Sequence, residues 1–495
     1  MLSIKKPAYK WVALSVTTIG SLMVAIDSTI VILALPNMLQ DLHSNLVLMT
    51  WVIIGYIMVS TVLQLTFGRM ADMFGRVRMY NLGFIVFTIG SVLCGLAPSD
   101  SLLIAFRIVQ GIGGAMLSAN AMAIITEIFP SEQRGRAMGF NAVTWGAGSV
   151  LGPVLGGVIL AFASWRWIFL VNLPIGIIGT LAAYLLLHDI APNPRGERFD
   201  LPGTLLFCVG LISLLLGLTA GIGAGWLSPP ILALFALAIV SFGSFVLWER
   251  RASYPVLDLH LFSSRRYAFS VAAATLQSLA VFAVNFLVIF YLQGVRGYEP
   301  LKAALLILPL PLLTSIVGPL GGYWADHDRF KGTSPATAGL IVQCAALVIL
   351  TFLTPTTPYL VLALVLGLMG LGGALFWSPN TSTTMGAAPR NRLGVAAATL
   401  NTMRNVGMVC SFAVALAVAA ASMPPALVNK VFLGTVGHLP LSISTTFTGA
   451  MGHAFIASAC ICVIAIFFSV VRESRRAVTP TVSSGPVPSE LATKQ

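Results

Sequence analysis

The sequence predicts an all-α membrane protein with fourteen transmembrane helices, on three observations. Hydrophobic residues make up 57% of the 495 positions and charged residues 9%, a composition foreign to soluble globular domains. Runs without a charged side chain recur along the whole chain, and each has room for one or two spans of about 20 residues. The sequence lacks the ten-residue alternating segments of a membrane β-barrel, so helices account for every span.

Taken in chain order, the runs give six spans, then two, then six. The first six occupy residues 11–187, and the run 201–248 holds two more around a turn signal at 223–230. Six further spans follow in 267–471. We therefore expect four regions: a six-helix bundle at 1–190, two inserted helices at 191–264, a second six-helix bundle at 265–472, and a polar, proline-rich, disordered tail at 473–495.

The net charge of +12 indicates orientation in a membrane and not nucleic-acid binding. If the amino terminus is cytoplasmic, 22 of the 28 Lys and Arg residues fall at the cytoplasmic side and four outside. Positive residues collect on that side in membrane proteins. We expect a multi-pass protein of the cell membrane with both termini in the cytoplasm. The remaining two basic residues, Arg107 and Arg404, lie within predicted spans.

Three short motifs return in the same order later in the chain. GRMAD at 68–72 is echoed by GYWAD at 322–326, and GIGGA at 111–115 by GLGGA at 370–374. FPSEQRG at 129–135 is echoed by a related segment, APRNRLG at 388–394. The offsets are 254, 259 and 259 residues, which indicates an internal repeat. Membrane transporters are commonly built from two such halves with the substrate site between them.

Asp27, near the middle of the first span, is expensive to place in a bilayer and therefore marks an ion or substrate path. It lies about 14 Å from the outer end of its span, and Arg107 lies about 10 Å from the outer end of the fourth span. Similar depth permits contact without requiring it. We expect this pair to serve in proton coupling, because alternating access can change the balance between the charged and neutral carboxyl group. A permanent structural ion pair is the alternative.

Several motifs together resemble those of the major facilitator superfamily. GRMADMFGRVR at 68–78 is similar to its inner-loop signature, RIVQGIGGA at 107–115 to its fourth-span motif, and GSVLGPVLGG at 148–157 to its antiporter motif. DSTIVILALP at 27–36, with fourteen spans, resembles the fourteen-span drug:proton antiporter family. The resemblance implies two bundles that rock about a central cavity, with an outside proton exchanged for an internal hydrophobic or amphiphilic compound.

The glycines and charged residues of these motifs also allow inferences from their physical properties alone. Gly68 lets two helices approach closely, and Asp72 can accept hydrogen bonds at a helix amino terminus. We expect five residues to form a latch for the inward-closed state: Gly68, Asp72, Gly75, Arg76 and the repeat-related Asp326. The alternative is a generic basic loop. We expect a second set of residues to form a packing surface that seals one access state: Gly148, Gly152, Pro153, Gly156 and Gly157. Plain helix packing is the alternative.

The resemblance places the substrate cavity on the first and fourth spans of each half. Polar and aromatic candidates there are Asn120, Gln277, Phe282, Asn285, Trp377 and Asn380, with Arg404 in the thirteenth span. For each of the first six, packing or helix–helix bonding is the alternative, and for Arg404 the alternative is a side chain that snorkels to the inner face. The second half has no carboxylate within a span, so dications are disfavoured, and neutral, weakly cationic, amphiphilic or anionic compounds fit better.

An ion gradient is the expected energy source. A nucleotide-binding P-loop needs Lys followed by Ser or Thr, and the sequence contains no such pair. HExxH, CxxC and GxSxG are also missing from the sequence, so we expect no enzyme activity, metal or cofactor. The expected partners are protons, a small substrate and lipid, and the protein is expected to be a monomer. Export of an endogenous metabolite or lipid, and a membrane sensor or enzyme without transport activity, remain alternatives.

Overall fold

The computed structural model describes residues 9–44, 46–189, 199–257, 259–298, 300–326, 334–422 and 440–473, and these residues form helices and connections without strands. The expected all-α class is therefore confirmed for this part of the chain. Beyond Glu473, the predicted tail lies outside the described residues.

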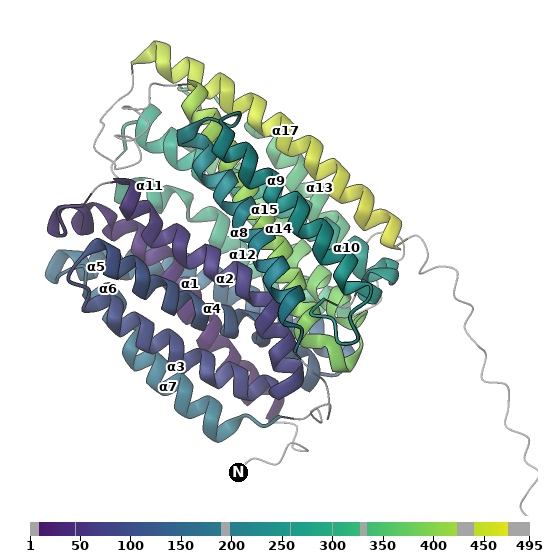
Figure 1. Cartoon of the computed structure of the whole chain (residues 1–495). Helices are drawn as coiled ribbons and strands as arrows, with labels where there is room; N and C mark the ends of the chain where they lie inside the picture. The colour runs from purple at the N-terminus through teal and green to yellow at the C-terminus, as the bar shows by residue number, and fades with distance from the viewer. Residues whose placement is uncertain are drawn as a thin grey trace, which may run out of the picture.

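The first half of the chain forms six long apolar helices and one short one. Figure 1 shows them in purple and blue, gathered on one side of the molecule. The short α6 leads into α7, and the two together occupy the predicted sixth span. The helices are α1 Tyr9–Asp41, α2 Leu46–Phe74, α3 Arg76–Gly95, α4 Asp100–Ile128, α5 Arg134–Phe162, α6 Trp167–Leu170 and α7 Asn172–Leu186, with the 3₁₀ turn η1 Ser131–Gln133 before α5.

Two inserted helices follow, α8 (Leu201–Ala224) and α9 (Pro229–Glu249). Asp200 caps α8, since its carboxylate accepts the Gly203 N–H at 2.9 Å. The two helices pack against each other, and α8 also contacts α2 of the first half and α15 of the second. Helix α8 therefore lies along the seam between the halves, with α9 packed on it.

The second half repeats the first with more interruptions. Its helices are η2 Leu259–Ser263, α10 Arg265–Phe290, η3 Tyr291–Val295, α11 Pro300–Ile307, α12 Pro309–Asp326, α13 Pro335–Leu350, α14 Tyr359–Gly386, η4 Arg390–Arg392, α15 Leu393–Ser422 and α17 Leu441–Glu473. The charge-free run 303–325, expected as one span, is divided at Leu308. Pro309 and Pro311 follow directly, and proline supplies no N–H for a helical hydrogen bond.

Eleven helical segments of the described residues are long and apolar enough to cross a membrane. The three long helices not among them are α12, α13 and α15, of which α13 has 16 residues. Adding these three gives fourteen, so the structure is compatible with the predicted number. The count of fourteen itself stays a prediction.

The two halves meet along α2 with α15 and α5 with α12. At both contacts a repeat-related glycine removes the side chain that would separate the helices. A Cβ on Gly68 would lie 2.6 Å from the Gly394 carbonyl oxygen, and a Cβ on Gly322 would overlap the Gly135 carbonyl. The sequence repeat thus forms two matching close approaches. We call the end of the molecule that carries them the Asp72 face, and the opposite end the Asp41 face.

Candidate functional site

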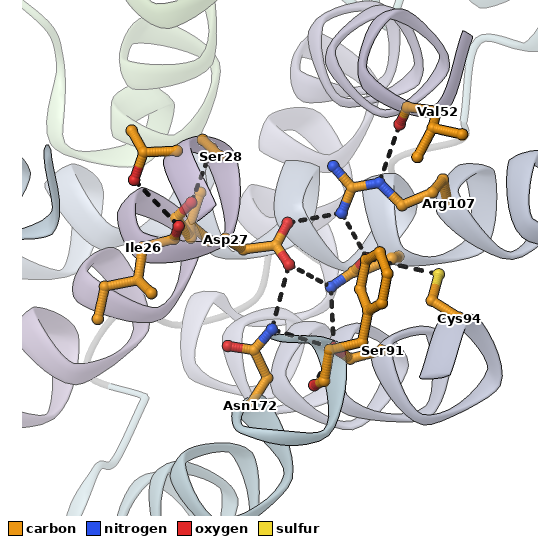
Figure 2. Close-up of polar contacts among 12 residues, drawn as sticks. Ile26, Asp27, Ser28, Val52, Ser91, Cys94, Arg107 and Asn172 are labelled. Atoms are coloured by element: carbon orange, nitrogen blue, oxygen red, sulfur yellow. Dashed lines mark hydrogen bonds and ion pairs between the residues drawn. The ribbon is translucent and has the colours of Figure 1, made fainter. Parts of the chain in front are cut away.

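Asp27 and Arg107 form a buried ion pair inside the first half. One Arg107 Nη lies 2.7 Å from an Asp27 carboxylate oxygen, and the two side chains are 0% and 1% exposed. Figure 2 shows Asp27 of α1 pointing toward Arg107 of α4. The depth argument allowed this contact, and the structure makes it.

Neutral polar side chains complete the surroundings of the carboxylate. Gln110 Nε2 and Asn172 Nδ2 donate to its second oxygen at 2.9 and 3.1 Å, and both also donate to the Ser91 hydroxyl. Ser91 in turn donates to the Phe169 carbonyl at 2.8 Å. Four helices, α1, α3, α4 and α7, therefore meet at one carboxylate (Figure 2). Its oxygens have the partners that a buried charge requires.

Arg107 is fixed by further contacts on its own side. Its Nε donates to the Val52 carbonyl at 3.0 Å, and its guanidinium lies 4.3 Å from the centre of the Tyr56 ring.

A second ion pair of the first half, at the Asp41 face, is much more exposed than the pair of Asp27 and Arg107. Asp41 and Arg166 lie 2.6 Å apart, with side chains 50% and 34% exposed. The hydrogen bond from Arg166, with one from Trp165, holds the pKa of Asp41 below its usual value.

Asp72 joins the two halves at the Asp72 face. Its carboxylate accepts the backbone N–H groups of Gly394 and Val395, the first residues after Leu393 begins α15, at 2.9 and 3.0 Å. A negative charge at a helix amino terminus is favourable. Arg76 bonds the same carboxylate at 2.8 Å and donates to the Arg390 carbonyl at 2.8 Å. Of the residues expected to form a latch, Asp72 and Arg76 therefore bond across the two halves, and the role of the set as a latch stays a prediction.

Other residues near Asp72 hold this arrangement in place. Glu127 accepts a hydrogen bond from Arg76 at 2.8 Å, which ties the end of α4 to the cluster. Gly75 adopts φ +107°, the conformation that turns the chain from α2 into α3 and that glycine tolerates. Asp326 is the last residue of α12 on the same face, and its side chain lies outside what the structure describes.

The glycines of α5 pack against the segment of α1 that carries Asp27. A Cβ on Gly148 would overlap Ala25, and one on Gly152 would overlap Thr29. The Thr29 hydroxyl also donates to the Gly148 carbonyl at 3.2 Å. Both contacts lie within the first half, so a sealing role between access states stays a prediction. The remaining residues of the motif continue along α5: Pro153, Gly156 and Gly157.

A cavity of about 260 Å³ lies between the halves. Its walls come mainly from α5 of the first half and from α10, α12, α14 and α15 of the second. A smaller cavity of about 10 Å³, with room for about one water, adjoins it and is reached by Ser21 and Val24 of α1. Asn141, Trp145 and Arg404 line both.

Five of the seven expected cavity residues line the larger cavity: Gln277, Phe282, Asn285, Trp377 and Arg404. The structure corrects the placement of Asn120 and Asn380. Asn120 donates to the Met116 carbonyl of its own helix at 2.7 Å. Asn380 lies on the face of α14 toward α10 and α17, where it bonds the Ser270 carbonyl and Arg472 at 3.1 and 2.6 Å. The binding role of the other five stays a prediction.

A helical chain with two related halves, a buried ion pair and a cavity at the seam fits one family of known proteins. Residues 17–412 match the Major Facilitator Superfamily. The chain belongs to this superfamily. Its members are transporters, so transport and not catalysis is the activity of the fold.

Several relatives of this facilitator carry names of resistance or transport proteins. The multidrug resistance protein Stp of Mycobacterium tuberculosis is 36% identical over 82% of this chain and 75% of its own. The methylenomycin A resistance protein of Bacillus subtilis is 32% identical over 90% of both chains. The riboflavin transporter RibZ of Clostridioides difficile is 32% identical over 80% of this chain and 85% of its own.

Solved structures of major facilitators share the fold. A crystal structure of the human organic anion transporter MFSD10 matches with a TM-score of 0.64 at 15% identity, over 92% of this chain and all of that one. The proton:xylose symporter XylE matches with a TM-score of 0.61 at 14% identity, over 93% and 95% of the two chains. At these identities the likeness shows the fold alone.

Sequence reasoning missed three residues around Asp27 in this facilitator, namely Ser91, Gln110 and Asn172. Gln110 was within reach, because it lies three residues after Arg107 and so on the same helix face. Ser91 and Asn172 carry no comparable signal, since single neutral polar residues are common in apolar helices. Asn141 of α5, which donates to the Ser21 hydroxyl at 3.1 Å and lines both cavities, was missed as well.

Proposed function

We propose that this major facilitator exports hydrophobic or amphiphilic compounds from the cell by proton-coupled antiport, as a member of the fourteen-span drug:proton antiporter family. The observation that carries the proposal is the cavity of about 260 Å³, because helices of both halves form its walls. A site at the seam changes its exposure when the halves rock, which is what alternating access requires. Its largely apolar lining suits hydrophobic ligands.

The latch supports the same proposal. The hydrogen bonds of Asp72 and Arg76 to α15 and η4 hold the halves together at the Asp72 face, which we expect to be cytoplasmic from the distribution of Lys and Arg. We infer that this arrangement closes the cavity toward the cytoplasm. Breaking these bonds, and closing the opposite face, gives the state that loads an internal substrate.

Proton coupling is assigned to Asp27. The carboxylate takes a proton from outside, which neutralises it and breaks the ion pair with Arg107. It releases the proton inside, and the ion pair forms again. The path to the substrate runs along α1: Val24 lines the smaller cavity and lies three residues from Asp27, about 4.5 Å along the helix axis. The glycines of α5 pack on the same segment of α1, and α5 packs on α12. A change at Asp27 therefore has a packed route to the seam.

Transport in inverted membrane vesicles tests the proposal. The probes are a panel of hydrophobic fluorescent dyes with anionic, neutral and cationic members. We expect the wild type to accumulate at least one dye under an imposed pH gradient, and Asp27→Asn to lose this accumulation by about 100-fold or more, since a positioned proton-transfer group typically contributes about 10²–10⁴-fold. Asp41→Asn, which removes a carboxylate from the exposed pair with Arg166, should retain it. Gradient-driven uptake that persists in Asp27→Asn contradicts the assignment.

Export of an endogenous metabolite is the second candidate. It is favoured by the similarity to a riboflavin transporter and by the hydrogen-bonding side chains among the cavity residues, such as Gln277 and Asn285. Deletion of the gene separates the two functions. A drug exporter leaves cells sensitive to added compounds, whereas a metabolite exporter leaves them with an internal compound that accumulates.

A further inference from the structure

Arg404 differs from the buried arginines Arg76 and Arg107, each of which pairs with a carboxylate. It lies on α15 where the two cavities join, and its guanidinium is 5.3 Å from the Trp145 ring centre and 5.5 Å from that of Trp377. The two indoles belong to α5 and α14, and so to opposite halves. One cation is thus held between one indole of each half.

This guanidinium has no counter-ion among the described residues. Its Nε is buried without a hydrogen-bond partner, and no salt bridge to a described carboxylate involves it. Arg107, in contrast, pairs with Asp27, and Arg76 pairs with Asp72 and Glu127. An unpaired cation within a membrane protein is expensive, and indole faces offset the missing partner in part.

The charge of the surrounding walls points the same way. Among the described residues that line the two cavities, Arg404 is the single charged one, and the polar lining consists of amides and hydroxyls such as Asn141, Ser149, Gln277 and Asn285. The Asn285 carboxamide oxygen is buried without a partner, so it can accept a hydrogen bond from a neutral donor group of a ligand and does not bind the anionic group itself. A low-dielectric cavity with one positive charge attracts anions and repels cations.

We propose that the cavity binds planar aromatic compounds that carry an anionic group, with Arg404 as the counter-ion and Trp145 and Trp377 as the stacking surfaces. This inference rests on the proposed function, whose substrate class it narrows. The guanidinium presents a fork of donors that matches a carboxylate or phosphate in two hydrogen bonds. The indoles supply apolar contact for the ring system. Both halves then contact one ligand.

Equilibrium binding to the purified full chain in lipid nanodiscs tests the inference. The probes share one ring system and differ in charge: naphthalene-2-carboxylate, its methyl ester and 2-naphthylmethylammonium, each followed by its own fluorescence anisotropy. We expect the carboxylate to bind the wild type at least tenfold more tightly than the other two. Arg404→Gln should weaken carboxylate binding by about 10- to 100-fold, the worth of a charge-assisted hydrogen bond, and leave the ester unchanged.

Two further variants complete the design. Arg404→Lys keeps the charge but loses the fork, so its carboxylate affinity should fall between those of the wild type and Arg404→Gln. Arg266→Gln removes an exposed arginine at the start of α10 and should leave all three affinities unchanged. Equal wild-type affinity for the three probes overturns the inference, as does tighter binding of the ammonium compound, and neither result needs a variant to fold. Selective binding without proton-driven uptake would instead contradict the proposed function.

Discussion

Replacement of Arg107 by methionine is expected to destabilise the folded protein by about 3–5 kcal/mol, because it leaves the Asp27 carboxylate buried without its cation. The side chains of the pair are 0% and 1% exposed, so water cannot take the place of the guanidinium. Gln110 and Asn172 still donate to the carboxylate, but neither carries a charge. Unfolding in mixed detergent micelles, monitored by loss of helical circular dichroism, measures the change.

A double variant separates the buried charge from lost packing. Asp27→Asn combined with Arg107→Met removes both charges, and we expect it to be more stable than Arg107→Met alone. Arg166→Met breaks the half-exposed pair with Asp41 and should lower stability by about 1 kcal/mol or less. Equal losses for Arg107→Met and Arg166→Met would show that burial of the first pair has no energetic consequence.

Asp72→Asn is expected to open the Asp72 face. The carboxylate accepts two backbone N–H groups at the start of α15 and bonds Arg76, and charge-assisted bonds contribute about 1.5–3 kcal/mol each. The amide keeps one acceptor oxygen and loses the charge. A weakening of about 2 kcal/mol would change the ratio of closed to open forms about 30-fold. We also expect slower turnover with ligand affinity largely intact.

Spin labels on either side of the seam measure this opening. Phe74, at the end of α2, is 46% exposed, and Gly386, at the end of α14, has open space at its Cβ position. With cysteines at these two sites in a background lacking the native cysteines, Asp72→Asn should populate a longer distance than the parent. Asp100→Asn removes a carboxylate in the first turn of α4, which accepts the Ser101 N–H and the Ser44 hydroxyl near the Asp41 face, and should leave the distances unchanged. An unaltered distribution in Asp72→Asn would mean that this carboxylate does not hold the halves together.

The fold was largely predictable because a bilayer imposes a simple rule on sequence. Long apolar runs and the position of basic residues indicated the helices, and the repeat of GRMAD in GYWAD indicated the two halves. The close approaches at Gly68 and Gly322 agree with that repeat. The break at Leu308 was missed because residues 303–325 contain no charged side chain, so the run reads as one span. Pro309 and Pro311, which follow the break, were visible in the sequence.

The sequence predicted how deep each site residue lies in the membrane, but not toward which neighbouring helix its side chain points. Position along a span placed Asp27 and Arg107 at one level of the membrane, and the structure brings them into contact. Depth says nothing about which way a side chain points around its helix. Asn380 and Trp377 are three residues apart on α14, yet Trp377 lines the cavity and Asn380 bonds Arg472 of α17. Such a choice depends on which neighbouring helix each face meets.

The central claim, that Asp27 takes up and gives up a proton, is tested most directly by infrared difference spectroscopy of the reconstituted protein. The pH is lowered across the range in which vesicles transport, and wild type is compared with Asp27→Asn. The account predicts a carboxylic acid C=O band that grows as the pH falls in the wild type and is missing from the variant. An identical set of bands in the two proteins, with Asp27 ionised throughout that range, would contradict it.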